Sequence, residues 1–383
     1  MAFTINTVVT AAQTLTSATD IGVITANGAL VTAGTPAVSI TGAGSFLVND
    51  GLISSISFCL NAAADFSLMN SGLMTTDNTC INISIAGVTT TNAAITNTGE
   101  IVSTMSSAIV SAESGLTLQN SGFISGRSNA INLGSTDLSD LNRINNSGLI
   151  AVQPTSSIDN AISCNGTLRL VNSGTILGNL NLGIGHDVVD NRAGTISGSI
   201  GLDNGNNLFL GGALGEAVTA GSGLDTLRGE AGDDDLVSGF GDDSVRGGSG
   251  DDHIRASFGS DQIYGGLGDD TIDGGNETDL MKGGTGEDVF VFIAPGDSDL
   301  GQTADRIADF RHGDDLIDLQ AFAPGVFNFV GNNALSGGGI ASFGYTRSAA
   351  VVTVLADVNG DGTADFRIEV LGTKALALSD FLI

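Results

Sequence analysis

The 383-residue sequence contains no tryptophan and few prolines, cysteines, tyrosines or basic residues. Its 13 lysines and arginines face 42 acidic residues, a net charge of −29. This charge argues against nucleic acid as a partner, because phosphate contacts need a basic patch. No apolar run approaches the length of a transmembrane helix, so no membrane span is predicted. The remaining composition, without helical periodicity, predicts a nearly all-β protein.

The most regular feature is an aspartate that recurs at every ninth position. Glycine mostly occupies the positions four and two before it, and an apolar residue always lies two after it, as in GGSGDDHIR (247–255). The eight aspartates are Asp225, Asp234, Asp243, Asp252, Asp261, Asp270, Asp279 and Asp288. This G-G-x-G-x-D-x-U-x pattern resembles the nonapeptide repeat of the RTX family, which implies a calcium-dependent parallel β-roll.

The repeat has a physical rationale. The x-U-x triplet is a short strand with its apolar residue inward, and the glycines permit positive φ in the turns. Two nonamers make one 18-residue coil, and coils stack about 4.8 Å apart with aspartates and carbonyl oxygens at the outer edges. All-oxygen cages of this kind suit Ca²⁺ better than Mg²⁺, and the stacking allows up to about six ions. The predicted ligands are the eight aspartate carboxylates and the backbone carbonyls of Gly229, Gly247, Gly265 and Gly283.

Charge is concentrated in the same region. Residues 220–383 hold 29 acidic and 9 basic residues, whereas residues 1–219 hold 13 and 4. Without a cation the acidic part is expected to repel itself and stay unfolded. Calcium binding would then supply folding free energy. Two repeats are degenerate: Glu277 replaces a glycine, and ASFGSDQIY (256–264) lacks its first two glycines.

The first half carries a looser repeat. An Asn-x-Gly-x-apolar cassette recurs every 20 to 27 residues, for example NSGFI (120–124) and NSGLI (146–150). This spacing fits one coil of a three-faced parallel β-helix, with stacked asparagines bonding along the axis. The pattern resembles the β-helical regions of haemagglutinin-like and autotransporter-passenger proteins. Cys59 and Cys80 each follow an equivalent asparagine by ten residues, which predicts stacked inward positions as buried filler, although the spacing also permits a bridge.

The end of the sequence carries further motifs. DRIADFRHGDDLIDL (305–319) and Asp380, Phe381, Leu382 and Ile383 resemble the C-terminal module of serralysin-type RTX proteins. The resemblance implies an uncleaved signal for type I export from a Gram-negative bacterium, with the type I secretion machinery as a partner and a secreted or cell-surface location. The first residues show no basic and apolar regions of a cleavable signal peptide, which agrees with this expectation.

A separate acidic loop begins like an EF-hand. Asp357, Asn359, Asp361 and Asp365 occupy ligand positions 1, 3, 5 and 9, with glycine at position 6. Ile368 stands where the bidentate glutamate belongs. The loop is therefore interpreted either as a further Ca²⁺ site or as a polar hairpin turn.

No catalytic signature appears. The three histidines are isolated, so the H-E-x-x-H zinc motif of a protease is missing. A polysaccharide lyase or epimerase is the alternative, because some of these enzymes join a β-helix to RTX repeats. That chemistry needs clustered Lys, Arg, His or Tyr, and residues 1–201 contain four arginines, one histidine and neither Lys nor Tyr. We therefore expect no enzyme but an adhesin or structural protein that binds carbohydrate, matrix or further copies of itself.

The predicted fold is all-β: a right-handed parallel β-helix continuing into a Ca²⁺-bound parallel β-roll, with a C-terminal β-hairpin-rich cap. The predicted boundaries are 1–201 for the β-helix, 202–219 for degenerate junction turns, 220–292 for the roll and 293–383 for the serralysin-like module.

Overall fold

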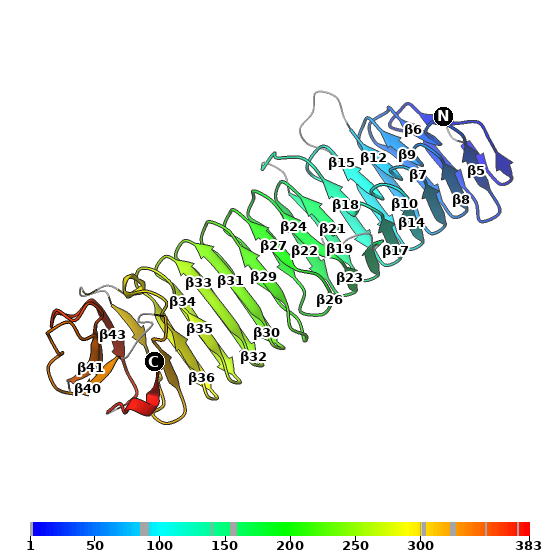
Figure 1. Cartoon of the computed structure of the whole chain (residues 1–383). Helices are drawn as coiled ribbons and strands as arrows, with labels where there is room; N and C mark the ends of the chain where they lie inside the picture. The colour runs from blue at the N-terminus through cyan, green and yellow to red at the C-terminus, as the bar shows by residue number, and fades with distance from the viewer. Residues whose placement is uncertain are drawn as a thin grey trace. The chain divides into compact units, whose positions relative to one another are not determined.

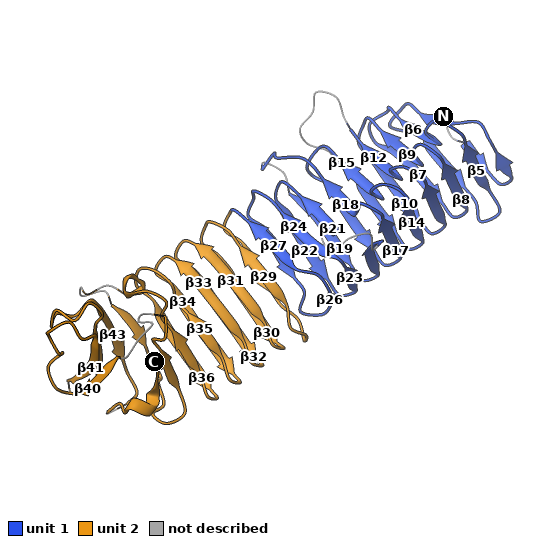
Figure 2. Cartoon of the chain, viewed as in Figure 1, with its two compact units in different colours: residues 1–204 blue, residues 205–383 orange. Residues whose placement is uncertain are grey.

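A computed structural model describes residues 3–84, 92–138, 141–153, 159–298, 300, 304–321, 327–348, 351–373 and 375–383. The chain forms two compact units, Met1–Asn204 and Gly205–Ile383 (Figure 2). Apart from two 3₁₀ turns, η1 (Pro295–Asp297) and η2 (Leu378–Asp380), the elements are β-strands (Figure 1). The predicted all-β class is confirmed.

Unit 1 is a three-faced parallel β-helix, as the cassette spacing predicts, because each coil contributes one strand to each of three sheets. The pairings among its described strands are parallel, for example β10 with β7 and β13. The first sheet contains β1 (Phe3–Ile5), β4 (Ile21–Ile24), β7 (Ser45–Asn49), β10 (Phe66–Asn70), β13 (Ala94–Asn97), β16 (Thr117–Asn120), β19 (Asn142–Asn146), β22 (Leu168–Asn172) and β25 (Val188–Asp190). The second contains β2 (Val8–Val9), β5 (Ala29–Thr32), β8 (Leu52–Ser55), β11 (Leu73–Thr76), β14 (Glu100–Ser103), β17 (Phe123–Gly126), β20 (Leu149–Val152), β23 (Thr175–Leu177) and β26 (Thr195–Ile196). The third contains β3 (Gln13–Leu15), β6 (Val38–Ile40), β9 (Leu60–Ala62), β12 (Ile81–Ile83), β15 (Ile109–Ser111), β18 (Asn129–Leu133), β21 (Asn160–Cys164), β24 (Asn179–Leu182) and β27 (Ile200–Asp203).

A buried column of asparagines runs through the turns of unit 1. The Nδ2 of each asparagine donates to the Oδ1 of the next at 2.7–2.8 Å, and the side chains are at most 2% exposed. The members are Asn49, Asn70, Asn97, Asn120, Asn146, Asn172 and Asn191. The column begins at Asn49 because Ile24 stands at the paired position of β4. We call this column the Asn ladder. Apart from Oδ1 of Asn49 at its start, which accepts no hydrogen bond from a described residue, its bonds satisfy side-chain amides that would otherwise be buried without partners, and so they fix the register of the coils.

The cysteines of unit 1 lie in the interior. Cys59, Cys80 and Cys164 are buried and free. Cys80 contacts Cys59, as the stacked positions predicted, and burial raises the pKa of the Cys80 thiol well above its usual value. The thiols therefore act as small apolar filler.

Unit 2 begins as a two-sheet parallel roll. One sheet contains β28 (Leu208–Leu210), β30 (Thr226–Ala231), β32 (Ser244–Ser249), β34 (Gln262–Leu267), β36 (Leu280–Thr285) and β38 (Asp305–Ile307). The other contains β29 (Ala217–Ala220), β31 (Asp235–Phe240), β33 (His253–Phe258), β35 (Thr271–Asp273), β37 (Val289–Val291), β39 (Leu316–Asp318) and β44 (Phe381–Leu382). Paired residues along the repeats differ by 18, for example Leu227 with Val245. The apolar residue of each triplet is at most 3% exposed, as the repeat predicts.

The end of unit 2 is the predicted hairpin-rich cap. β41 (Ser342–Arg347), β42 (Val352–Asp357) and β43 (Phe366–Val370) form an antiparallel meander, and β40 (Asn328–Gly331) pairs with β41. β43 also pairs in parallel with β38, and β44 pairs with β39. Phe329, Phe343 and Phe381 pack with ring centroids 4.8–5.9 Å apart. Asp380 and Phe381 of the terminal motif are thereby buried in this unit, whereas Ile383 is exposed.

Candidate metal centre

The site lies in the turns between the two sheets of the roll. Gly248 and Gly250 have φ of 128° and 129°, a region that side-chain-bearing residues rarely adopt. A Cβ on Gly250 would lie 2.3 Å from the carbonyl oxygen of Gly232, one coil earlier. The glycines therefore allow the turns of successive coils to stack directly on one another, which brings equivalent aspartates together.

The eight predicted aspartates form two stacked ladders, one in each row of turns. In each ladder the backbone N–H of each of the first three aspartates donates to the Oδ1 of the aspartate 18 residues later, for example from Asp252 to Asp270 at 2.9 Å. One row holds Asp234, Asp252, Asp270 and Asp288, and the other holds Asp225, Asp243, Asp261 and Asp279. All eight are at most 3% exposed, so the turns enclose carboxylates that the repeat alone places at the outer edge.

The second oxygen of each carboxylate, Oδ2, indicates what these ladders bind. In all eight, and in Asp305, Oδ2 is buried and accepts no hydrogen bond within the described part of the chain. Leaving a charged acceptor unsatisfied costs more than the 1–3 kcal/mol typical of a neutral group. A cation between the carboxylates would remove this cost, and buried carboxylates are normally found paired or bound to a metal.

The pKa values of the ladder aspartates also indicate a cation site. Burial first, and then the charges of neighbouring aspartates, raise the pKa of Asp261 and Asp270 to about 7. The pKa of Asp279 rises to about 9, first through burial and then through the charge of Asp305. Burial also raises the pKa of Asp234 to about 8. In a metal-free roll, burial therefore favours the protonated form of these carboxyl groups near neutral pH, and a bound cation would displace those protons.

The glycines whose carbonyls are the predicted ligands lie beside the carboxylates. A Cβ built on Gly229, Gly247, Gly265 or Gly283 would fall 1.9–2.2 Å from the Oδ2 of the aspartate five residues later. We call this row of turns (229–234, 247–252, 265–270 and 283–288) the glycine edge. On the opposite, mixed edge the equivalent positions are Ala220, Ser238, Ala256 and Gly274. The two edges therefore present their aspartates in different surroundings, a distinction that the aspartate period does not reveal.

Three aspartates extend the ladders beyond the predicted set. Asp279 donates its N–H to Asp305 Oδ1 at 2.8 Å, Asp288 to Asp315 Oδ1 at 3.3 Å, and Gly283 to Asp309 Oδ1 at 3.1 Å. The sequence separations are 26 and 27 residues instead of 18, so counting by nines misses them. The D-x-I-x-D-F motif at 305–310 was the available signal, because its Asp–x–Ile repeats the D-x-U of the nonamer.

The EF-hand-like loop is arranged differently. Asp357 is buried and its carboxylate accepts the N–H groups of Gly360, Asp361 and Gly362 at 2.7–3.1 Å. Asp365 Oδ2 accepts the N–H groups of Val358 and Asn359. These bonds organise the turn between β42 and β43. A further Ca²⁺ at Asp357, Asn359, Asp361 and Asp365 stays a prediction.

The donor set of the roll fits calcium. Orphaned carboxylate oxygens lie next to glycine backbone on stacked turns, and calcium accepts carboxylate and carbonyl oxygens together in flexible geometry. Within the described residues no group of three or more His, Cys, Asp or Glu side chains converges on one point. Backbone carbonyls would therefore have to complete any cage. The Asp ladders would hold the ion, and its charge would neutralise them.

These features define the class of protein: a calcium-binding β-roll protein of the RTX type. The chain belongs to the family described as Peptidase M10 serralysin C terminal, whose sequence model matches residues 106–383. The RTX and serralysin-like assignment made from the motifs is thus confirmed. Serralysin-like RTX proteins are secreted by Gram-negative bacteria. No helix among the described residues has the length and apolar character needed to cross a membrane.

Two further similarities were found. The chain is 39% identical over 90 residues to Metallopeptidase AprA of Pseudomonas marginalis, which covers 23% of this chain and 18% of that protein. The match thus spans less than a fifth of that relative's length. The chain is also similar to the solution structure of the AlgE6R3 subunit from the Azotobacter vinelandii mannuronan C5-epimerase. That match has 25% identity and a TM-score of 0.23, and it covers 42% of this chain and 80% of the other.

Proposed function

We propose that this chain is exported unfolded by a type I secretion system, folds on external calcium, and acts without catalysis at the cell surface or in the extracellular matrix. The observation that carries the proposal is the set of nine buried aspartate Oδ2 atoms, in two ladders, that accept no hydrogen bond within the described part of the chain. These atoms stack in a region with 29 acidic and 9 basic residues. Calcium removes the repulsion and the desolvation cost together, so binding free energy becomes folding free energy.

The position of the terminal motif supports the order of events. Phe381 and Leu382 pair with Ile317 and Asp318, and Asp380 is buried against the His312 loop, with Nδ1 of His312 2.8 Å from its carboxylate. A secretion machine could read residues 380–383 only before these contacts form. Low cytosolic calcium would keep the segment accessible, and external calcium would then draw it into the sheet.

The calcium dependence is tested on the purified full chain by circular dichroism in chelator, in millimolar Ca²⁺ and in millimolar Mg²⁺. We expect β-structure to increase with Ca²⁺ and little with Mg²⁺. Identical spectra in chelator and calcium would refute the folding switch.

The non-enzymatic role rests on the composition of residues 1–201, which offer four arginines, one histidine, no lysine and no tyrosine for acid–base work on a uronate. The test is incubation with alginate and pectin, following the absorbance of unsaturated uronates and the epimer ratio by NMR. Turnover of either kind would replace this proposal with a lyase or an epimerase.

A further inference from the structure

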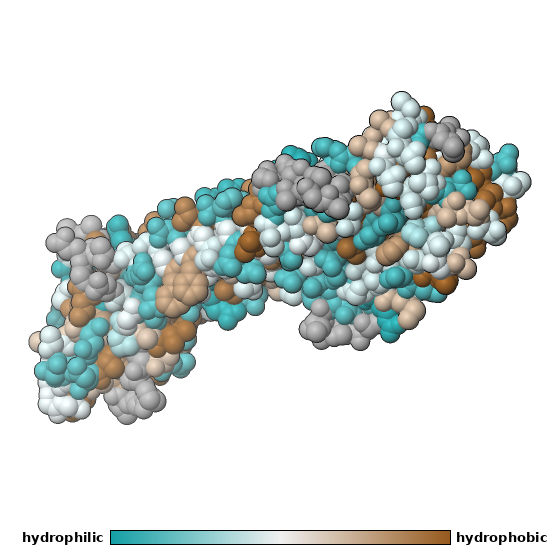
Figure 3. All heavy atoms as spheres, turned by 90° about the horizontal axis from the view of Figure 1, so that it is seen from above, coloured by the Kyte–Doolittle hydropathy of each residue, from teal (hydrophilic) through white to brown (hydrophobic). Residues whose placement is uncertain are grey.

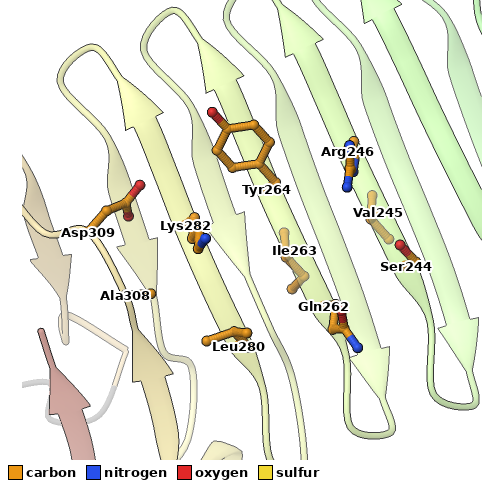
Figure 4. A pocket seen from close by; sticks show the side chains of 10 residues that line it. All are labelled: Ser244, Val245, Arg246, Gln262, Ile263, Tyr264, Leu280, Lys282, Ala308 and Asp309. Carbon is orange, nitrogen blue, oxygen red and sulfur yellow. The ribbon is translucent and has the colours of Figure 1, made fainter.

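The outer face of one roll sheet carries an unexplained column of positive charge. The last residues of the triplets on β30, β32, β34 and β36 are Arg228, Arg246, Tyr264 and Lys282. They are paired in register from strand to strand, and all four side chains are exposed. We call them the Arg–Tyr–Lys column. Figure 4 shows Arg246, Tyr264 and Lys282 side by side on successive strands.

This column does not serve the stability of the fold. Arg228 lies directly opposite Arg246, and like charges at directly opposed positions of neighbouring strands destabilise a sheet. None of the three cations forms an ion pair with a described residue, whereas Arg255 on the opposite sheet pairs with Asp235 at 3.2 Å. The four triplets of the column contain no acidic residue, although the unit as a whole is strongly acidic. No ion pair among the described residues therefore neutralises this column.

The surface around the column has the shape of a site. A shallow hollow of about 420 Å³ lies over the sheet, lined by Arg246, Gln262, Tyr264 and Lys282 with Leu280 on its floor, and Asp309 closes one end. Tyr264 is 41% exposed and Leu280 37% exposed. Elsewhere, on the face of the molecule shown in Figure 3, strongly apolar residues occur as small scattered groups among polar ones. Two arginines, a tyrosine ring and a lysine thus follow one another at one strand spacing, about 4.8 Å, and the Gln262 amide lies two residues from Tyr264 on the same strand.

We propose that the Arg–Tyr–Lys column binds a linear polysaccharide of uronic acids, laid across the strands. From Arg228 to Lys282 the column spans three strand spacings, roughly 14 Å, enough for several sugar residues. In a uronate polymer each ring carries a carboxylate, so an oligomer laid across the strands would place carboxylates near the three cations and a sugar ring near Tyr264. Arginine binds carboxylates through two parallel N–H donors, and a tyrosine ring offers an apolar face together with a hydroxyl.

The overall charge of the chain does not prevent this contact. At physiological ionic strength charges more than about 8 Å apart are largely screened, so the ligand responds chiefly to the nearest side chains. Calcium in the turns would reduce the negative field further. Nucleic acid is a poorer match, because its denser phosphates require a larger basic patch. The inference deepens the proposed function by naming a partner class, and it depends on that function only in requiring a folded roll.

The test measures binding of short uronate oligomers, too short to gel, to the full chain at fixed free calcium by isothermal titration calorimetry. Exposed charge pairs contribute about threefold each to affinity, so R228Q/R246Q/K282Q should lose roughly thirtyfold. Y264A should lose about fivefold. The matched control R255Q removes one arginine from the opposite sheet and should bind like the native chain. Binding to the native chain should weaken as salt is added.

Several results would overturn the inference. These are undetectable binding by a chain that circular dichroism shows to be folded, equal binding by the triple variant, or stronger binding of neutral dextran or DNA. Equal binding by the triple variant would mean that calcium bridges the oligomer to acidic residues. Melting of each variant in calcium verifies that its fold is retained. A circular dichroism spectrum that does not change with calcium would contradict the proposed function and not this inference. The comparison of uronate binding between the native chain and the triple variant would then still test the inference by itself.

Discussion

The contact between glycine and aspartate on the glycine edge makes a sharp prediction for Gly265→Ala. The backbone of Gly265 does not lie in the left-handed region, so the change tests space alone. The new Cβ would lie 2.2 Å from Asp270 Oδ2, and the carboxylate must retreat to at least 3.0 Å. That movement disturbs the 2.9 Å bond that Asp252 donates to Asp270 Oδ1. A hydrogen bond to a charged group contributes about 1.5–3 kcal/mol, so calcium affinity at this turn should fall roughly 10- to 150-fold.

The assay is a calcium titration of the full chain, followed by circular dichroism for the folding midpoint and by calorimetry for the number of sites. We expect G265A to raise the calcium midpoint and to weaken part of the bound calcium. The control is Gly201→Ala, where the nearest atom to a new Cβ is the carbonyl oxygen of Leu180 at 3.7 Å. If G265A and G201A give the same calcium midpoint, the aspartate at this turn does not bind the ion and the reasoning fails.

Three further changes follow from the same structure. Glu277 has φ of 86°, a conformation that costs a side-chain-bearing residue about 1–2 kcal/mol. Glu277→Gly should therefore raise the free energy of unfolding by roughly 0.5–1 kcal/mol, because the greater entropy of glycine in the unfolded chain offsets part of the gain. In chelator, lowering the pH should increase β-structure. Burial raises the pKa of Asp261, Asp270 and Asp279 in the folded chain to about 7, 7 and 9. Protonation of these groups therefore stabilises the fold fully below their ordinary pKa, near 3.8, and this stability is lost as the pH rises through 7 to 9. Asn120→Ala removes a donor and an acceptor from the Asn ladder and should destabilise unit 1 by roughly 3 kcal/mol in chemical denaturation.

Each of these has its own control and a contrary result. Glu277→Gln removes the charge but keeps the side chain, and an equal gain from it would show that charge, not φ, was relieved. A metal-free chain whose structure decreases between pH 8 and pH 5 would contradict the raised aspartate pKa values. Asn181 is exposed on β24, and Asn181→Ala should leave stability within about 0.5 kcal/mol of the native chain. If Asn120→Ala behaves like it, the Asn ladder does not stabilise the coils.

The sequence by itself determined most of the architecture, because a repeat places each residue on the same face in every coil. The nine-residue period identified the buried apolar residue of each roll triplet, such as Ile254 and Ile272, and the ladder aspartates. The Asn-x-Gly cassette identified the buried asparagine column of unit 1 and the coil that its spacing implies. Pairing at a constant offset requires no knowledge of distant contacts, so local pattern was sufficient for these features.

The tertiary structure alone decided what happens where the offset changes and where side chains meet. Asp305 and Asp315 join the ladders across longer separations because β38 and β39 return to the edge of the roll after intervening segments. The Oδ2 atoms became recognisable as orphans only when every neighbouring donor was placed. The Arg–Tyr–Lys column gained meaning in the same way, because its cations are exposed and form no ion pair with a described residue. A period gives the position of a residue, whereas the partners of that residue depend on every chain segment folded against it.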